Sequence, residues 1–296
     1  MSIVIKSLAE VSLADALKAW NDGFEGYFVN IRFSMDPFVW RMGMEGLSPE
    51  LSVVAYSGSR PVGIVVNGIR TIGDRKIAWN GGTGVATDMR RQGVGRQLVD
   101  VCLDLYRDHG VHTAYLEAIA ENHRAIALYE SVGYTTIDRV TALEQSNPLP
   151  PGAFSPSLNG RYTLKDGDPA DVAKLPFYQA QAAWQTQWPS VRDGRSVVVY
   201  DAAGTAMGYA LYKRGRNPAG EVTHIALYQC EVKDVPEAAQ EAWLNALLSE
   251  VYPAGLECRR VTVNLRASNA PLLRVLARAG FTPRVQQVMM ARDMEE

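Results

Sequence analysis

The sequence predicts an α/β fold made of two tandem domains, and three observations lead to this prediction. Strand-like alternation and helix-like periodicity follow one another along the first half of the chain. A proline- and glycine-rich segment, residues 146–160, separates the halves, and the second half repeats the pattern of the first. The length of 296 residues is about two domains' worth, and 47% hydrophobic residues suffice for ordinary cores.

The first domain, residues 1–145, is assigned element by element from periodicity and turn residues. A variable, aromatic-rich segment runs from the end of the first helix to about residue 47. The predicted strands are 3–7, 51–57, 61–70, 75–87, 113–120 and one from residue 134, and the predicted helices are 12–22, 91–108 and 123–131. Residues 146–160 are predicted to be a linker, and residues 161–296 the second domain.

A glycine turn between the strand ending near residue 87 and the helix after it predicts an anion site. Gly93 and Gly95 let the backbone bend and approach a ligand, and the free N–H groups of the first helical turn favour a negative charge. A Walker loop is excluded because Arg96 follows Gly95, and a dinucleotide fingerprint is excluded because Leu98 stands where its third glycine belongs. A glycine turn that merely starts a helix is the alternative.

A second motif lies about thirty residues further on, and the two together resemble the GNAT acetyltransferase family. Its members carry Asn-x-x-Ala-x-x-Leu-Tyr-x-x-x-Gly-Phe/Tyr, and the chain matches this pattern at Asn122, Ala125, Leu128, Tyr129, Gly133 and Tyr134. The family's pyrophosphate turn corresponds to Arg90, Gly93 and Gly95, and Thr87 departs from the proline that many members have. The order of predicted strands and helices matches the family fold.

The resemblance implies two GNAT-like domains, each a mixed, mostly antiparallel sheet flanked by helices, and it implies acetyl-CoA as cosubstrate. The pantetheine arm would lie against the backbone at the glycine-rich end of a strand. The alternative is that these glycines only form a β-bulge. The implied coenzyme-binding residues are Thr83, Gly84, Val85, Arg90, Arg91, Gln92, Gly93, Val94, Gly95, Arg96, Asn122, Ala125 and Tyr129.

The implied reaction is transfer of an acetyl group to a primary amine of a small molecule or a peptide N-terminus. In the resemblance the phenol of Tyr129 lies beside the coenzyme sulfur, where it can protonate the departing thiolate. Glu117 is the candidate base, with a solvated strand residue as the alternative reading. The rival function is an acetyl-CoA-binding sensor or scaffold without turnover, and a third is acyl transfer to a thiol or with a longer acyl group.

The acceptor pocket is expected from the aromatic-rich segment and one strand residue. Acidic side chains there could hold a cationic amine, whereas Arg32 could hold a carboxylate. The candidate substrate-binding residues are Phe24, Glu25, Tyr27, Phe28 and Trp79.

The second half reads as a degenerate copy of the first. Asn269 lies 147 positions after Asn122, and the same offset brings Gly280 and Phe281 onto the end of the motif. At this offset the phosphate turn is lost, with Glu237, Gln240 and Ala242 in place of Arg90, Gly93 and Gly95, and Leu276 stands at the Tyr129 position. The second domain is therefore predicted to bind no coenzyme and to serve as structure or as a wall of the acceptor site.

Composition sets the remaining expectations. With Lys+Arg 30 against Asp+Glu 32, nothing attracts nucleic acid or an anionic membrane in general. Three cysteines without paired spacing, and no signal-peptide pattern, favour a cytoplasmic protein. The histidines are scattered, so no metal is expected. A monomer and a homodimer remain equally open.

Overall fold

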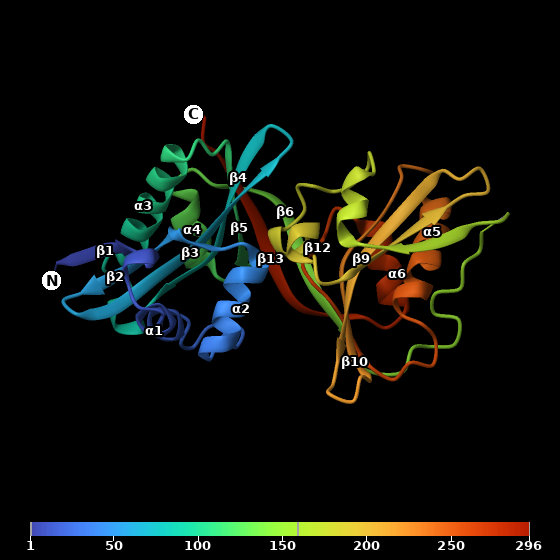
Figure 1. The fold of residues 1–296 in the computed structure, drawn as a ribbon, viewed down its shortest axis with the longest axis horizontal. Coiled ribbons are helices and arrows are strands. Elements are labelled where there is room, and N and C mark those ends of the chain that lie inside the picture. The colour runs from blue at the N-terminus through green and yellow to red at the C-terminus, as the bar shows by residue number, and fades with distance from the viewer. Residues whose placement is uncertain (1, 159, 296) are drawn as a thin grey trace. The chain divides into compact units, whose positions relative to one another are not determined.

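The computed structural model describes residues 2–158 and 160–295, which form two compact units (Figure 1). Unit 1 runs to Ile137 and also includes the chain from Val288 onward, and unit 2 is the chain between them. Residues 138–145, placed by the sequence in the first domain, and the linker thus fall in unit 2, while the last strand of the second half is divided, and its residues from Val288 onward fall in unit 1. The functional division into a coenzyme-binding and a degenerate domain stays a prediction.

Unit 1 is a mixed sheet flanked by helices, which confirms the predicted fold class. Its strands follow the order β1-β2-β3-β4-β5, with part of β13 beside β5. The pairs from β1 to β4 are antiparallel, and β4 pairs parallel with β5. The strands are β1 (Ile3–Ser7), β2 (Ser48–Ser57), β3 (Arg60–Ile72), β4 (Arg75–Val85), β5 (Thr113–Ile119) and β13 (Thr282–Asp293), and the helices are α1 (Leu13–Gly23), α2 (Met35–Glu45), α3 (Val94–Asp108) and α4 (His123–Glu130).

Helices α1 and α3 cover opposite faces of this sheet. A Cβ on Gly23 would lie 2.8 Å from Cα of Gly84, so the end of α1 rests directly on β4 at two glycines. On the other face, a Cβ on Gly63 would lie 2.9 Å from a methyl carbon of Leu98 in α3. Close packing on both faces therefore fixes the strand that the sequence assigns to the coenzyme.

Helix α2 is an element that the sequence reading did not identify. It begins after Ser34 and ends at Gly46, which takes φ 67, the left-handed conformation in which glycine ends helices. Phe38 and Met42 are its buried residues, and they are four positions apart on one helical face. The abundance of aromatic residues obscured this short apolar stripe.

Unit 2 repeats the architecture of unit 1. Its strands follow the order β6-β11-β10-β9-β8-β7, with β12 also beside β6, and β10 pairs parallel with β11 as β4 does with β5. Where unit 1 has α1 and α2, unit 2 has only short 3-10 turns between residues 169 and 190. The elements are β6 (Thr135–Gln145), β7 (Thr163–Gly167), β8 (Arg195–Tyr200), β9 (Ala206–Arg216), β10 (Val222–Val232), α5 (Glu237–Val251), β11 (Arg259–Thr262), β12 (Leu265–Arg266) and α6 (Ala270–Arg278).

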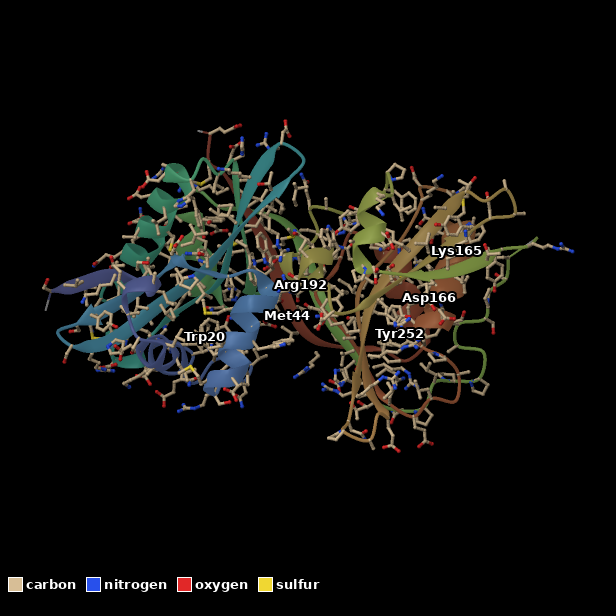
Figure 2. All side chains as sticks on the ribbon, in the orientation of Figure 1. Trp20, Met44, Lys165, Asp166, Arg192 and Tyr252 are labelled. Carbon is tan, nitrogen blue, oxygen red and sulfur yellow. The ribbon has the colours of Figure 1, made fainter. Side chains whose placement is uncertain are left out.

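The repeated motif forms the same cap in both units. The side chain of Asn122 accepts a hydrogen bond from Ala125 N at 3.3 Å, and that of Asn269 accepts one from Leu272 N at 3.3 Å. Within the predicted linker, Phe154 is buried and stacks on Tyr252 (Figure 2) with ring centroids 6.0 Å apart. That part of the linker belongs to the core of unit 2.

Residues from Val288 onward build part of the core of unit 1. Val288, Met290 and Met294 join its main hydrophobic cluster, and Met290 has no exposed surface. The side chain of Arg292 donates a hydrogen bond to the carbonyl of Val132, directly after α4. The sheet and the end of α4 therefore both depend on the last strand of the chain.

Candidate functional site

Strands β4 and β5 pair only at their beginnings. Their parallel ladder joins Ile77–Asn80 to Thr113–Leu116 and stops there, whereas β4 continues to pair with β3 as far as Val85. The register of β3 and β4 shifts at Gly81, which is a β-bulge. The two strands diverge beyond this bulge, so the edge of β4 that faces β5 is left open to a ligand.

The glycines of β4 make room for the protein's own side chains. A Cβ on Gly82 would lie 2.7 Å from the indole of Trp20 (Figure 2), and one on Gly84 would lie 3.1 Å from the ring of Phe24. A Cβ on Gly81 would lie 2.7 Å from the ring of Trp79. The glycine requirement here thus comes from close packing around β4, whatever the strand also binds.

The predicted anion site is an uncapped helix N-terminus. Gly93 stands at the N-cap of α3 in the left-handed conformation, φ 80, and contributes no side-chain hydrogen bond to the helix. The first intrahelical hydrogen bond of α3 runs from Gln97 N to Gly93 O at 3.0 Å. The N–H groups before Gln97 therefore have no helical acceptor and point toward the turn.

Two of the three predicted coenzyme arginines, Arg90 and Arg96, have partners within unit 1. Arg90 donates to the carbonyls of Val85, Gly23 and Glu25 at 2.9, 3.0 and 3.1 Å, so it ties the turn to the end of α1. Arg96 forms an ion pair with Asp100, 2.8 Å from Nε to Oδ1. These two side chains are engaged in structure, which sequence reasoning did not foresee.

Other members of the predicted coenzyme set line the same turn. Arg91 is exposed and, within residues 2–158 and 160–295, forms no ion pair. Gln92 donates a hydrogen bond to the carbonyl of Asp88 at 2.8 Å, which stabilises the turn. The side chain of Val94 is buried beneath the turn, so a ligand at the turn would meet only the backbone of this residue.

Tyr129 reaches the open edge of β4 from α4. It is 7% exposed, and its phenol interacts with the side chain of Thr83. Asn80, which the sequence reading did not select, donates from Nδ2 to Thr83 Oγ1 at 2.8 Å and holds that hydroxyl in place. Burial raises the pKa of Tyr129 to about 12, although Thr83 opposes the shift, so the phenol is protonated at neutral pH.

Tyr27 brings the aromatic segment to the same place. Its phenol is hydrogen-bonded to the side chain of Asn122, and burial raises its pKa. It packs edge-on against Phe24 and Phe28, with ring centroids 5.1 and 5.4 Å away. Four predicted site residues, Thr83, Asn122, Tyr129 and Tyr27, thus meet at one point.

The remaining acceptor candidates are arranged around this point in different ways. Phe28 is 56% exposed and Glu25 is exposed, whereas Trp79 is buried with 3% exposure. Trp79 Nε1 donates to Glu117 Oε2 at 2.7 Å, so one oxygen of the candidate base is already hydrogen-bonded. Glu117 is half-buried and is not a solvated strand residue.

Arg41 of α2 is a charged residue at this site that sequence reasoning missed. It donates to the carbonyl of Gly81 at 2.6 Å, pairs with Glu45 at 2.8 Å, and its guanidinium lies 4.8 Å from the ring centroid of Trp20. The only sequence signal was its spacing of four from Glu45, and that signal requires the helix to be recognised first.

The corresponding opening in unit 2 is filled. Glu231 lies 147 positions after Gly84, and its carboxylate lies 3.3 Å from Arg266 Nη2 and accepts a hydrogen bond from Asn269 at 3.0 Å. Burial raises the pKa of Glu231, and Arg266 opposes this shift. At the position that corresponds to Gly84, unit 2 therefore has a hydrogen-bonded carboxyl side chain, whereas unit 1 packs the ring of Phe24 against the glycine.

Within residues 2–158 and 160–295, His, Cys, Asp and Glu side chains form no group of three that could hold a metal ion. In the same part of the chain, each helix is too short or too polar to cross a membrane.

Comparison with known proteins gives one family match. A model of the acetyltransferase (GNAT) family matches residues 13–134. The [ribosomal protein bS18]-alanine N-acetyltransferase of Escherichia coli (strain K12) is 48% identical over 50 residues, 17% of this chain and 34% of that protein. The N-alpha-acetyltransferase 30 of Dictyostelium discoideum is 29% identical over 92 residues, 31% of this chain and 50% of that protein. The chain thus spans a third to a half of these relatives.

Similar solved structures cover the whole chain. A tandem GNAT protein from the clavulanic acid biosynthesis pathway has a TM-score of 0.65 at 18% identity, over 99% of this chain and 98% of its own. A GCN5-related N-acetyltransferase from Sphaerobacter thermophilus has a TM-score of 0.63 at 15% identity, over 99% and 96%. At these identities the likeness establishes the fold of both halves.

Proposed function

Because residues 13–134 belong to the acetyltransferase (GNAT) family, we propose that this chain is an acetyl-CoA-dependent N-acetyltransferase acting on a primary amine. The relatives named above are N-acetyltransferases by name, which supports the same class of reaction. The observation that carries the proposal is the meeting of Tyr129, Thr83, Tyr27 and Asn122 at the open edge of β4.

The residues of unit 1 fit the coenzyme at both ends. The uncapped N-terminus of α3 supplies backbone N–H groups and a positive helix end for the pyrophosphate, and Arg91 adds an available cation. The open edge of β4, from Gly82 to Val85, offers backbone groups to the amides of the pantetheine arm. A coenzyme bound in this way would have its thioester near Tyr129.

Acetyl transfer needs one proton removed and one supplied. The neutral amine attacks the thioester carbonyl, the C–S bond breaks, and the ammonium proton leaves the new amide while the thiolate takes a proton. Tyr129 is placed to supply the second proton because its raised pKa keeps the phenol protonated. Glu117 or a water held by it removes the first, with the Trp79 indole fixing the orientation of the carboxylate.

The acceptor is proposed to enter past the aromatic segment. Tyr27 and Phe24 form the inner wall, while Glu25 and Phe28 stand at the exposed rim. A carboxylate at the rim favours a cationic amine, and an exposed ring favours an apolar group beside it. A small-molecule amine and a peptide N-terminus both satisfy this description.

Unit 2 is proposed to bind no coenzyme. Glu231 and Arg266 fill its opening, and a coenzyme there would have to displace a buried ion pair that is also bonded to Asn269. We propose that unit 2 serves as a structural partner for unit 1.

The test combines binding and turnover on the full chain. Calorimetry with acetyl-CoA should give one site per chain, and a panel of primary amines should release free CoA thiol with at least one acceptor. A stoichiometry of two would contradict the proposal for unit 2. Tight binding without thiol release across small amines and peptides would favour the coenzyme-binding sensor, and absence of binding would overturn both.

A further inference from the structure

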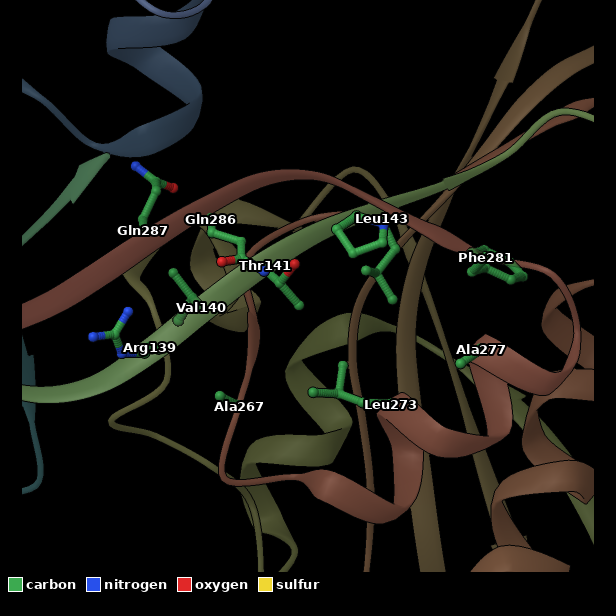
Figure 3. A pocket seen from close by; sticks show the side chains of 11 residues that line it. Arg139, Val140, Thr141, Leu143, Ala267, Leu273, Ala277, Phe281, Gln286 and Gln287 are labelled. Carbon is green, nitrogen blue, oxygen red and sulfur yellow. The ribbon is translucent and has the colours of Figure 1, made fainter. Parts of the chain in front are cut away.

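Unit 2 contains a cavity that the proposed acetyl transfer does not use (Figure 3). Its volume is about 280 Å³, close to the lower end of small-molecule sites. β6, α6 and the chain after α6 form its walls, and its apolar lining includes Val140, Leu143, Leu273, Ala277, Phe281 and Pro283. The cavity borders the core of unit 2, because Leu143 and Phe281 belong to that core and Leu273 packs against it.

The two ends of this cavity differ in chemistry. Figure 3 shows Arg139 and Gln287 at one end, and Leu143, Ala277 and Phe281 toward the other. A ligand that fills the cavity would therefore meet polar donors at one end and hydrocarbon along the rest of its length.

The polar groups at the first end lack partners in the protein. Within residues 2–158 and 160–295, the guanidinium of Arg139 forms no ion pair, and the side-chain amides of Gln286 and Gln287 form no hydrogen bond. The neighbouring carboxylate of Asp138 is already engaged, since it accepts from Ser268 Oγ and from Arg139 N, each at 2.7 Å. The side chains of Arg139 and Gln286 are exposed to water, and with Gln287 they form the polar end of an otherwise apolar cavity.

We propose that this cavity is a binding site for a small monocarboxylate with an apolar body, such as a medium-chain fatty acid or an aromatic acid. The planar guanidinium of Arg139 suits a carboxylate, and the glutamine amides add donors. The apolar body would lie between Leu273 and Ala277 of α6 and Phe281, where removal of hydrocarbon from water favours binding. An alcohol lacks the charge, and an amine of the same length would be repelled by Arg139.

The first experiment measures binding of octanoate, octanol and octylamine to the full chain by calorimetry, with and without saturating CoA. Octanoate should bind at one site per chain, at least about tenfold more tightly than either analogue, because a hydrogen bond to a charged group is lost with each. CoA should leave this binding unchanged. Displacement of octanoate by CoA, or equal affinity for octanol, would overturn the proposal.

Variants locate the site. Ala277→Trp fills the cavity from an exposed position on α6 and should abolish octanoate binding, whereas Ala238→Trp, exposed on α5, should leave it intact. Arg139→Gln should weaken octanoate about tenfold and leave octanol unchanged, and Arg195→Gln on β8 is its control. Octanoate affinity unaffected by both Ala277→Trp and Arg139→Gln in folded protein would show that the ligand binds elsewhere.

Discussion

The phenol of Tyr129 is buried and interacts with Thr83, which is itself held by Asn80, so its proton lies at the point where β4 and β5 diverge. Each link of this chain has one role: Asn80 orients the hydroxyl, the hydroxyl orients the phenol, and the phenol has the reactive proton. At the scale of single residues, two side chains therefore orient a third, and only the third, Tyr129, takes part in proton transfer.

We expect Tyr129→Phe to lower kcat by about ten- to a thousandfold and to leave the Kd for acetyl-CoA nearly unchanged, since losing a general acid removes an interaction made in the transition state. Steady-state kinetics with thiol detection and calorimetry measure the two effects. Tyr134→Phe is the matched control, because that buried ring lies 5.9 Å from Tyr129 and has no proposed proton role. Full turnover by Tyr129→Phe would assign the acid to water or another group.

The raised pKa of Tyr129 has a consequence for the pH profile. Between the ordinary tyrosine pKa of 10.0 and the value of about 12 in the folded protein, the native state keeps a proton that the unfolded chain loses. The contribution of Tyr129 to stability is thus complete below pH 10 and is lost as the pH rises toward 12. We expect kcat to show no fall assignable to this phenol below about pH 10, as a pH series with the Tyr129→Phe variant for comparison will measure.

The motifs marked several of the residues that lie together in the structure, whereas the roles of these residues stay predictions. Tyr129, Asn122 and Thr83 stand in or near the two family motifs, and the structure brings them together with Tyr27. Arg41 and Glu231 stand in no motif, because the function of each depends on a partner brought near by folding. The second role of Arg90, in bonding carbonyls of α1, was hidden for the same reason.

At the scale of elements, the start of α3 and the open edge of β4 form one continuous feature. The turn from β4 into α3 needs glycine at Gly93 because of its positive φ, whereas a Cβ on Gly95 would meet Leu128 and Val85 only at ordinary contact distances of 3.5 and 3.7 Å. The fold therefore requires the first glycine, and the second is free to serve a ligand.

This difference predicts opposite effects for two substitutions at one position. Gly95→Ala should raise the free energy of unfolding by up to about 1 kcal/mol, because alanine is the better helix former. Gly95→Glu should keep the fold and abolish acetyl-CoA binding, since a carboxylate would stand at the anion site. Thermal unfolding and calorimetry measure the pair, with Gly43→Ala in α2 as a control for helix propensity, because a Cβ there meets nothing within 4 Å. Normal affinity of folded Gly95→Glu for acetyl-CoA would show that the pyrophosphate binds elsewhere.

Most elements of unit 1 were predicted to within three residues because each has a regular apolar period and a turn at its end. The strand from 75, for example, was placed at 75–87 and is Arg75–Val85, and the helix at 123–131 is His123–Glu130. Helix α2 was missed because two of its apolar residues, Val39 at 44% and Trp40 at 61% exposure, do not follow the buried stripe.

At the scale of the whole molecule, unit 1 is not a continuous piece of sequence, because it joins the chain up to Ile137 to the chain from Val288 onward, whereas unit 2 is the single stretch between them. The duplication in the sequence suggested two consecutive domains, but Val288–Asp293 of β13 lies in unit 1 and residues 138–145 of β6 lie in unit 2. Sequence alone could not reveal this exchange, since equivalent strands of a repeat have the same pattern and fit either sheet.

Because residues from 288 onward belong to unit 1, we expect a substitution near residue 290 to lower the stability of unit 1. Met290→Ala removes a side chain with no exposed surface and should cost about 2–5 kcal/mol of stability. Hydrogen exchange should show the loss of protection in β4 and β5 while β9 and β10 keep theirs. Asp293→Ala, exposed on the same strand, should change stability by less than about 0.5 kcal/mol. Loss confined to β9 and β10 would contradict this assignment of the strand.

The position of β13 also sets the order in which the protein becomes complete during synthesis. Residues 2–137 leave the ribosome first, yet their sheet lacks its last strand until residues 288–293 have been made. All of unit 2 can form in that interval, so the half proposed to carry the chemistry is the last to finish. A truncated messenger RNA, or a ribosome that stalls before residue 288, would therefore release a chain in which the sheet of unit 1 is incomplete.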